Sequence, residues 1–429
     1  MISWTAERVA AAAGAELVRA APGGPRGAAI DSRAVEPGAL FVGLRGERTD
    51  GGRYAGDVLR AGAWGVLVAP EHAAGLPGEG AVLTAADPLA AMQRLARAWR
   101  RALGARVIAI TGSVGKTSTK DLTAALVAPH RSVHFSRANH NTEIGLPLEL
   151  LAAADGTEVL VLEMGMRGHG QIAELAAIAE PDVGVITNIG PVHLELVGSL
   201  DGVAAAKAEL LEGLPDGGTA VVPVDEPRLE RWLRPGLRVV RFGDGGDVSL
   251  DGIELPFTSA HMRRNAMAAV AAARAAGVEP AGRVDVQLSA LRGERVELPG
   301  GAVLVNDCYN ANPLSMRAAL DDLAVQTPTG RRIAVLGDML ELGPDERALH
   351  REIGEHAARS GVELLVTVGP LAAEMASAFG GETVRVADAA AAAEELRGRL
   401  REGDLVLVKG SRGVGLEVVA ETLAEKEAD

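Results

Sequence analysis

The chain has 429 residues, a formal net charge of −14 and one cysteine, Cys308, so it cannot form an intramolecular disulfide and we expect a reducing, cytoplasmic location. Its acidic balance and its aromatic content of 3% exclude a general nucleic-acid binder, which needs cationic and stacking side chains. Charged residues interrupt every alanine-rich stretch before the ~18 apolar residues of a membrane span, so we expect no membrane insertion.

The first part of the chain has the pattern of a small α/β unit. Amphipathic helical segments alternate with short apolar runs, and glycine and proline punctuate the joins. The expected helices cover 5–13 and 54–63, and the apolar runs cover 39–42 and 64–68. Asp87-Pro88, a capping residue followed by a first-turn proline, predicts a further helix that continues to Leu103. We assign residues 1–84 to the first domain.

From Arg106 onward, strand, loop and helix alternate, which is the signature of a parallel sheet covered on both faces. The expected strands of this middle domain, residues 85–291, cover 107–110, 158–162 and 182–189. A third domain, residues 292–429, has expected strands at 302–305, 332–336, 364–368 and 405–408. We therefore predict an α/β protein of three domains, the third being doubly wound and Rossmann-like.

A phosphate-binding loop is the strongest motif. Residues 111–118, TGSVGKTS, lie between an apolar strand and a helix predicted over 116–127. The backbone N–H groups of such a loop converge on phosphate oxygens, Lys116 can bridge outer phosphates and Thr117 can ligate Mg²⁺. Ile110 stands where the full motif has glycine, so the alternative is a tight turn with a surface lysine. The candidate nucleotide-binding residues are Gly112, Ser113, Val114, Gly115, Lys116, Thr117 and Ser118.

Three further residues could hold a metal ion. Glu163 closes the strand at 158–162 and His193 follows the strand at 182–189, so both lie at the ligand-binding edge of the sheet. Lys207 falls on the apolar stripe of a helix predicted over 199–214, and a buried neutral lysine can react with carbon dioxide to form a metal-binding carbamate. The alternatives are a strand-end glutamate facing solvent, a structural histidine, and a lysine that snorkels to water.

Polar loops follow three strands of the third domain. They cover 306–313 (NDCYNANP), 336–343 (LGDMLELG, with His350 on the next helix) and 409–412 (KGSR). Ligands bind at such edges, but Asn, Asp and Pro are also ordinary turn residues, so these segments could simply be βα loops. After the first of them we expect a helix that begins near Ser315. Cys308 shows no chemical partner and is expected to be a small packed residue rather than a nucleophile.

Together these motifs resemble the ATP-dependent muramyl-peptide ligases of cell-wall synthesis, the Mur ligases. The resemblance runs from Asp31 to Arg412 and is carried by ITGSVGKTS, LEMGM, NIGPVHLE, AAAKAE, DCYNANP, LGDMLELG and VKGSRG. It implies a UDP-sugar-binding first domain, a central P-loop ATPase domain and a third domain that closes over the site. Within the family, YNANP and LGDMLELG resemble the branch that joins D-alanyl-D-alanine to UDP-N-acetylmuramoyl-tripeptide.

The resemblance also implies roles for individual residues. The implied catalytic residues are Lys116, Lys207 and His193. Two Mg²⁺ ions would be held by Thr117, Glu163, His193 and Lys207, the last as a carbamylated lysine. ATP would also contact Asn265, Arg295, Asp307 and Tyr309. The substrate side would include Asp31, Ser32, Arg33, Asn139, Asn141, Asn310 and Asn312.

The implied reaction is ATP-dependent amide formation through an acyl-phosphate, with release of ADP and phosphate, by a monomeric enzyme. The sequence departs from the family pattern at Gly52, where a histidine is usual, and at 222–225, where VPVD replaces Asn-x-Asp. The stretch between Gly243 and His261 is also shorter than expected. Two alternatives stay open: a sister ligase with another acceptor amine, and a nucleotide-binding regulatory module that has lost catalysis.

Overall fold

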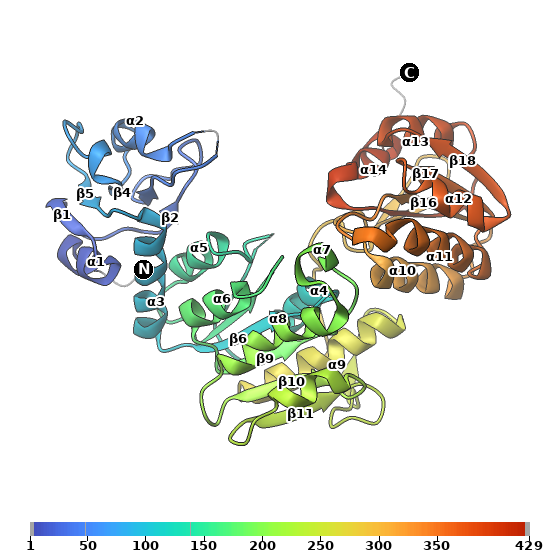
Figure 1. Ribbon diagram of the computed structural model, residues 1–429, viewed down its shortest axis with the longest axis horizontal. Coiled ribbons are helices and arrows are strands. Elements are labelled where there is room, and N and C mark those ends of the chain that lie inside the picture. Colours follow the sequence, from blue (N-terminus) through green and yellow to red (C-terminus); the bar gives the residue numbers. More distant parts are fainter. Residues whose placement is uncertain (1–3, 48, 138, 425–429) are drawn as a thin grey trace.

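The computed structural model describes residues 4–47, 49–137 and 139–424, which form three α/β bodies that follow one another along the chain (Figure 1). Each body is built on one main sheet of five or six strands with helices packed against it. This confirms the predicted three-domain α/β architecture, whereas the domain boundaries after residues 84 and 291 stay predictions. Among the helices of these described ranges, none is long and apolar enough to cross a membrane.

The first body has a mostly parallel sheet in the order β1-β5-β4-β3-β2, with β1 as an antiparallel edge strand. Its elements are α1 (Ala6–Ala13), β1 (Glu16–Arg19), β2 (Ala28–Ala29), β3 (Leu40–Val42), α2 (Ala55–Arg60), β4 (Gly65–Val68) and β5 (Ala81–Thr84). The helix predicted over 54–63 is present as α2, but it begins one residue later and ends three residues earlier than predicted. A 3₁₀ turn capped by Asp50 precedes α2, and Gly62, at φ 93°, cannot continue a right-handed helix.

Helix α3 (Pro88–Leu103) joins the first body to the second, and its start is as predicted. The Asp87 side chain accepts a hydrogen bond from the Ala90 N–H, and Pro88 occupies the first turn. The apolar face of α3 enters a core shared by both bodies, where Trp99 packs edge-on against Trp4 with ring centroids 5.2 Å apart. Buried apolar surface therefore holds the first two bodies together.

The middle body has a six-stranded, all-parallel sheet in the order β11-β10-β9-β6-β8-β7. Its strands are β6 (Arg106–Thr111), β7 (Val133–Phe135), β8 (Val159–Glu163), β9 (Val183–Ile186), β10 (Thr219–Pro223) and β11 (Arg238–Phe242). Its helices are α4 (Lys116–Val127), α5 (Gly145–Ala152), α6 (Gln171–Ala179), α7 (Leu194–Val197), α8 (Leu200–Glu212) and α9 (Ala260–Ala275).

Strand β6 shows why the strands of this sheet have continuous apolar sequences. Val107 and Ala109 enter the core with α5, α6 and α8, whereas Ile108 and Ile110 enter the core with α4 and α9. Both faces of the strand are therefore covered, and every position along it favours an apolar side chain.

The strand predicted over 182–189 is too long, because β9 ends at Ile186. Beyond it, the Thr187 N–H still donates to the Thr111 carbonyl of β6, but the side chains of Thr187 and Asn188 hydrogen-bond Val114 of the loop before α4. The sequence pattern also misses β7, β10 and β11. Of these, β7 and β11 are the two edges of the sheet and keep partly exposed side chains. A separate two-stranded pair joins β12 (Ile253–Glu254) to β13 (Gly282–Arg283).

The C-terminal body has a sheet in the order β14-β15-β19-β16-β17-β18, parallel except for the β14–β15 pair. Its strands are β14 (Glu294–Glu297), β15 (Val303–Asn306), β16 (Arg332–Gly337), β17 (Leu364–Val368), β18 (Glu382–Val386) and β19 (Leu405–Lys409). Its helices are α10 (Pro313–Val325), α11 (Glu346–Arg359), α12 (Ala373–Phe379), α13 (Ala389–Arg397) and α14 (Glu417–Ala424). The sequence pattern misses β14 and β18, which lie at the two edges.

Helix α10 begins at Pro313, two residues earlier than predicted. The cause is a reciprocal capping box: the Ser315 N–H donates to the Asn312 side chain, and the Asn312 N–H donates to Ser315 Oγ. A proline is well tolerated in the first helical position because its missing N–H would have no helical partner there.

Close packing of α11 against α12 makes Gly354 a sensitive position. A Cβ added there would overlap the backbone carbonyl oxygen of Met375. We predict that Gly354→Ala lowers the free energy of unfolding by about 1–3 kcal/mol, the usual range for overpacking, in a denaturant titration. Gly398→Ala is the matched control, because that Cβ meets open space and should change stability by less than about 0.5 kcal/mol. Equal effects of the two substitutions would contradict this packing.

Candidate active site

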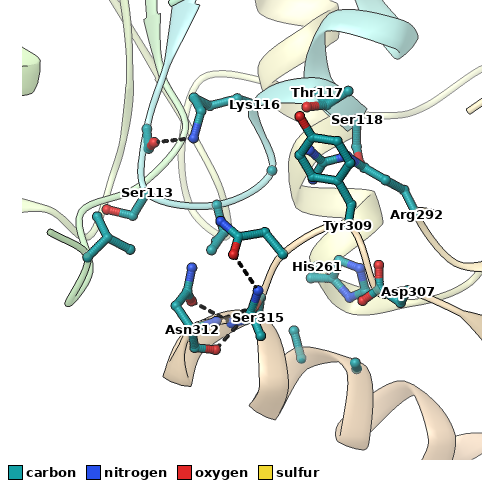
Figure 2. Close-up of a pocket in the computed structure, with 18 of the residues that line it drawn as sticks. Ser113, Lys116, Thr117, Ser118, His261, Arg292, Asp307, Tyr309, Asn312 and Ser315 are labelled. Atoms are coloured by element: carbon teal, nitrogen blue, oxygen red, sulfur yellow. Dashed lines mark hydrogen bonds between the residues drawn. The ribbon is translucent and has the colours of Figure 1, made fainter. Parts of the chain in front are cut away.

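One cavity of about 1190 Å³ lies between the middle and C-terminal bodies. The residues after β6, β8 and β9 form one wall, and the loops after β15, β16 and β19 form the opposite wall. Figure 2 shows the loop before α4 facing Asn312 and Ser315 at the start of α10. The cavity therefore joins the carboxyl edges of two parallel sheets, which is where open α/β sheets bind ligands.

Two glycines shape the loop between β6 and α4. A Cβ on Gly112 would overlap the hydroxyl oxygen of Thr187, so the loop can approach β9 only without a side chain. Gly115 adopts φ 78°, and a Cβ there would lie 2.5 Å from Asn265 Oδ1 on α9. Asn265 is therefore buried against the phosphate loop, and its predicted approach to the nucleotide base stays a prediction.

The same loop is fixed by hydrogen bonds to the segment after β9. The Val114 N–H donates to Asn188 Oδ1 at 3.0 Å, and Ser113 Oγ accepts from the Gly190 N–H at 2.8 Å. Immediately beyond, α4 begins at Lys116, and the first N–H groups of a helix lack helical acceptors. A helix N-terminus behind a glycine loop is suited to an anion, and the phosphate-binding role of residues 112–118 stays a prediction.

Lys116 lies in this loop with its ammonium Nζ donating to Gly112 O at 2.9 Å. Burial in the cavity lowers the pKa of Lys116, and the nearby Glu163 carboxylate acts in the opposite direction. The ammonium group is therefore held over the loop, where it can reach phosphate oxygens.

Thr117 and Glu163 meet as the strand register requires. Ile110 pairs with Glu163 across β6 and β8, and the Thr117 hydroxyl donates to Glu163 Oε2 at 2.7 Å. The other carboxylate oxygen accepts from Asn141 Nδ2 at 2.8 Å. Three predicted site residues, from three separate segments, are therefore in direct contact.

Hydroxyl and carboxylate oxygens are the ligands that Mg²⁺ prefers, together with waters and substrate phosphates. The oxygens of Thr117 and Glu163 at the phosphate loop fit this ion. In the part of the chain that the structure describes, no group of three or more His, Cys, Asp and Glu side chains converges as a metal cage. The predicted set contains only two residues of those types, Glu163 and His193.

Lys207 is buried, with 2% of its surface exposed, on the face of α8 that carries Val203 and Leu210. This decides against a lysine that snorkels to water. None of the described residues places a carboxylate within ion-pair distance of its ammonium group. Burial lowers the pKa of Lys207 well below its ordinary value, and the positive charge of Lys116 lowers it further.

His193 contacts the C-terminal body. Its Nδ1 donates to Glu341 Oε2 at 2.6 Å, which leaves Nε2 as the nitrogen available to a ligand. Both residues have left-handed backbone, at φ 53° and 61°, and non-glycine residues in this region are typical of functional sites. Burial lowers the pKa of His193, while Glu341 acts in the opposite direction.

The loop after β15 is held by a buried lysine. Lys409 Nζ, at the end of β19, donates to Asp307 Oδ2 at 2.6 Å and to the carbonyl oxygens of Asp307 and Asn310 at 3.2 and 3.1 Å. Asp307 therefore reaches the cavity wall already paired with a cation. Asn310 also lines the cavity, and its side-chain oxygen accepts from the Ala311 N–H.

Tyr309 stacks on Arg292, with the guanidinium carbon 4.1 Å from the ring centroid. Figure 2 shows the two side chains together beside Thr117 and Ser118. Burial raises the pKa of Tyr309, so the phenol stays protonated near neutral pH. Arg295, predicted to contact ATP, also lines the cavity and donates to Gln326 Oε1 at 2.6 Å.

The predicted substrate residues fall into two places. Asn139, Asn141, Asn310 and Asn312 line the cavity, although the Asn312 side chain is used to cap α10. Asp31, Ser32 and Arg33 lie in the first body and do not line it. There, Arg33 pairs with Asp31 through Nη2 at 2.7 Å, which lowers the pKa of Asp31 to about 2.

Several residues that line the cavity carry no signal of a ligand contact in the sequence pattern. Arg292 marked only the start of a domain, and His261, which pairs with Asp322 across the two bodies at 3.2 Å, served only as a motif boundary. Asn188 lay inside an expected strand. Only Lys409 carried a usable signal, because a lysine directly after a buried strand needs a partner.

Comparison with known proteins assigns the family. Three family descriptions match in chain order: the Mur ligase family catalytic domain at residues 26–100, the Mur ligase middle domain at 110–273 and the Mur ligase glutamate ligase domain at 291–412. The UDP-N-acetylmuramoyl-tripeptide–D-alanyl-D-alanine ligase of Bacillus subtilis is 36% identical and covers 93% of each chain. The chain belongs to the Mur ligase family.

Other Mur ligases agree with this assignment. The Escherichia coli K12 protein with the same name is 33% identical over 92% of this chain and 93% of its own. A crystal structure of MurF from Acinetobacter baumannii superimposes with a TM-score of 0.87 at 29% identity, covering 99% of each chain. MurF ligase from Thermotoga maritima, solved in complex with ADP, superimposes with a TM-score of 0.78 at 28% identity, covering 93% of this chain and 97% of that one.

The buried thiol of Cys308 provides a test of how the loop after β15 is packed. Burial, followed by the charges of Glu417 and Asp307, raises the pKa of Cys308 to about 12. At pH 8 only about one thiol in ten thousand is then ionised, and the thiolate is the reactive form. We predict that a disulfide reagent labels the native protein at least a hundredfold more slowly than the protein in guanidinium chloride. Equal rates would place Cys308 outside the core.

Proposed function

We propose that this chain is an ATP-dependent ligase that joins D-alanyl-D-alanine to UDP-N-acetylmuramoyl-tripeptide, a step of peptidoglycan precursor synthesis. The observation that carries the proposal is one cavity that gathers Lys116, Thr117, Glu163 and Lys207 from one body and Asp307 from another. An activated acyl intermediate must be kept from water, and a site between two bodies can exclude it. The curated relatives carry this activity in their names.

In the first step, the terminal carboxylate of the tripeptide attacks the γ-phosphorus of ATP. The bond between the γ-phosphorus and the bridging oxygen breaks, and ADP leaves with the electron pair. The product is an acyl-phosphate, a much better electrophile than a carboxylate. Because two anions must approach one another, positioning and charge neutralisation supply most of the rate. Lys116 and the N-terminus of α4 would serve this role, and the contact of the ammonium group with Gly112 O, in the loop before that helix, supports it.

In the second step, the neutral amine of D-alanyl-D-alanine attacks the acyl carbon. A C–N bond forms, the C–O bond to phosphate breaks, and the nitrogen loses a proton to solvent or to the departing phosphate. The loops after β15 and β16, with Asn310 and Glu341, border the cavity and would contact this amine. Closure of the C-terminal body would bring the two halves into register before the intermediate forms.

Magnesium would be held by Thr117 and Glu163, with His193 and a carbamylated Lys207 as further ligands. Its chemistry is to neutralise the charge that develops on the transferred phosphoryl group. A buried lysine without a carboxylate partner supports the carbamate, because the uncharged amine is the form that reacts with carbon dioxide. Lys116 and Thr117 are assigned to the triphosphate, and Asn265, Arg295, Asp307 and Tyr309 to the rest of the nucleotide.

The reaction is tested by phosphate release from ATP with purified protein, UDP-N-acetylmuramoyl-tripeptide and D-alanyl-D-alanine. We expect release that requires both substrates and one amide product, identified by mass spectrometry. Release that is equally fast without the dipeptide, or a better rate with a single amino acid in its place, would reject this acceptor.

A Lys116→Met variant should lose at least about a hundredfold in rate in the same assay. The substitution removes the lysine cation that would contact the transferred phosphate.

Carbamylation of Lys207 is tested by chemical rescue. We expect Lys207→Ala to reduce the rate by on the order of a hundredfold, a loss typical of a disrupted metal-ligand shell. Added acetate or formate should restore part of the activity in this variant and leave the wild-type rate unchanged. Lys207→Arg is the matched control, since it keeps a cation but cannot form the carbamate. Full activity of the arginine variant would disprove this role.

A further inference from the structure

Glu149, which the function proposed above does not use, is the second buried glutamate of the middle body besides Glu163. It lies on α5 with 1% of its surface exposed. Its carboxylate accepts hydrogen bonds from His140 Nδ1 at 2.6 Å and His134 Nε2 at 3.1 Å, and Arg137 Nε lies 3.5 Å away. A buried carboxylate is unfavourable unless it is paired, so these contacts are required by its position.

These partners surround the connection between β7 and α5. His134 lies on β7, before the connection, and His140 lies within it, whereas Glu149 follows on the helix. The backbone makes a second contact at Gly145, where a Cβ would lie 2.5 Å from the Cα of His140. Gly145 and Glu149 are four residues apart and so share one face of α5, which clamps His140 by its backbone and by its imidazole.

The other side of this connection faces the cavity. Asn141, the neighbour of His140, donates from Nδ2 to Glu163 Oε1 at 2.8 Å, and its carbonyl accepts from the Gly165 N–H at 2.8 Å. Gly165 also fits tightly, because a Cβ there would lie 3.0 Å from Asn141 Cγ. Glu163 in turn accepts from Thr117 at the phosphate loop. A continuous set of contacts therefore runs from α5 to the phosphate loop.

We propose that Glu149 is a positioning residue: through His140 it holds residues 139–144 in place, so that Asn141 keeps the Glu163 carboxylate oriented towards the phosphate loop. Glu149 itself touches neither substrate nor metal. The part of this inference that concerns magnesium rests on the function proposed above, whereas the part that concerns the loop does not.

The loop is tested without any reaction, by hydrogen–deuterium exchange of the full-length protein. We expect Glu149→Gln to speed exchange of the Asn141 and Gly165 amides, both of which donate hydrogen bonds within this set, by about tenfold or more. His140→Ala should have the same effect and leaves the buried carboxylate paired with His134. Glu158→Gln, in an exposed pair with Arg131 at the opposite end of β8, is the matched control and should change neither amide.

The magnesium part is tested by steady-state kinetics of the same variants. We expect the Mg²⁺ concentration for half-maximal rate to rise about tenfold in Glu149→Gln and His140→Ala, the lower end of the range for groups that orient metal ligands. The rate at saturating Mg²⁺ should fall much less, and Glu158→Gln should match the wild type. A merely structural role would lower the melting temperature and leave this concentration unchanged, and that result would overturn the proposal.

The two proposals fail in different ways. A wild-type protein that forms no product rejects the proposed function, and the exchange experiment then still decides whether Glu149 holds the loop. Unchanged exchange at Asn141 and Gly165 in both variants overturns the positioning role, whatever the activity of the wild type.

Discussion

The hydrogen bond from Thr117 to Glu163 is the contact around which the site is organised. It joins the residue after the phosphate loop to the end of the neighbouring strand, and the parallel pairing of Ile110 with Glu163 makes that meeting unavoidable. A carboxylate buried at this point needs polar partners, which Thr117 and Asn141 supply. The same carboxylate oxygens of Glu163 therefore stabilise the folded loop and are suited to bind a hard cation such as Mg²⁺.

The three bodies are joined in two different ways. The first and second share an apolar core around α3, whereas the second and third meet through polar pairs such as His193 with Glu341 and His261 with Asp322. Polar interfaces of this kind allow relative motion, while a continuous apolar core resists it. Movement is therefore expected between the second and third bodies, across the cavity. The left-handed backbone of His193 and Glu341, each worth about 1–3 kcal/mol of strain, lies at that boundary.

Much of the middle body could be predicted because its signals are local. Strand β6, its glycine loop and α4 follow one another without interruption. The start of α3 is indicated by two adjacent residues, Asp87 and Pro88. The position of Lys207 on the apolar stripe of its helix is compatible with a buried side chain or with one that reaches water. Only the packing of the folded chain shows that it is buried. Contacts between distant residues had no such signal. His193 and Glu341 are 148 positions apart, and the pairing of Glu149 with His140 depends on how α5 lies over an edge strand that the pattern does not reveal.

The contact between the Lys116 ammonium and the Gly112 carbonyl has a consequence for selectivity. The loop supplies its own neutral acceptor for the lysine, and this contact uses one of the three N–H donors of the ammonium group. The contact fixes the position of the ammonium group, while the other two donors remain available to an incoming acceptor. A phosphate oxygen carries a negative charge that attracts the ammonium group by Coulomb interaction, whereas a hydroxyl or amide oxygen carries only a partial charge. The ammonium group therefore binds a phosphate oxygen more strongly than it binds a hydroxyl or an amide. By holding the ammonium group in position, the glycine carbonyl makes the loop selective for charged over uncharged ligands, independently of the rest of the cavity.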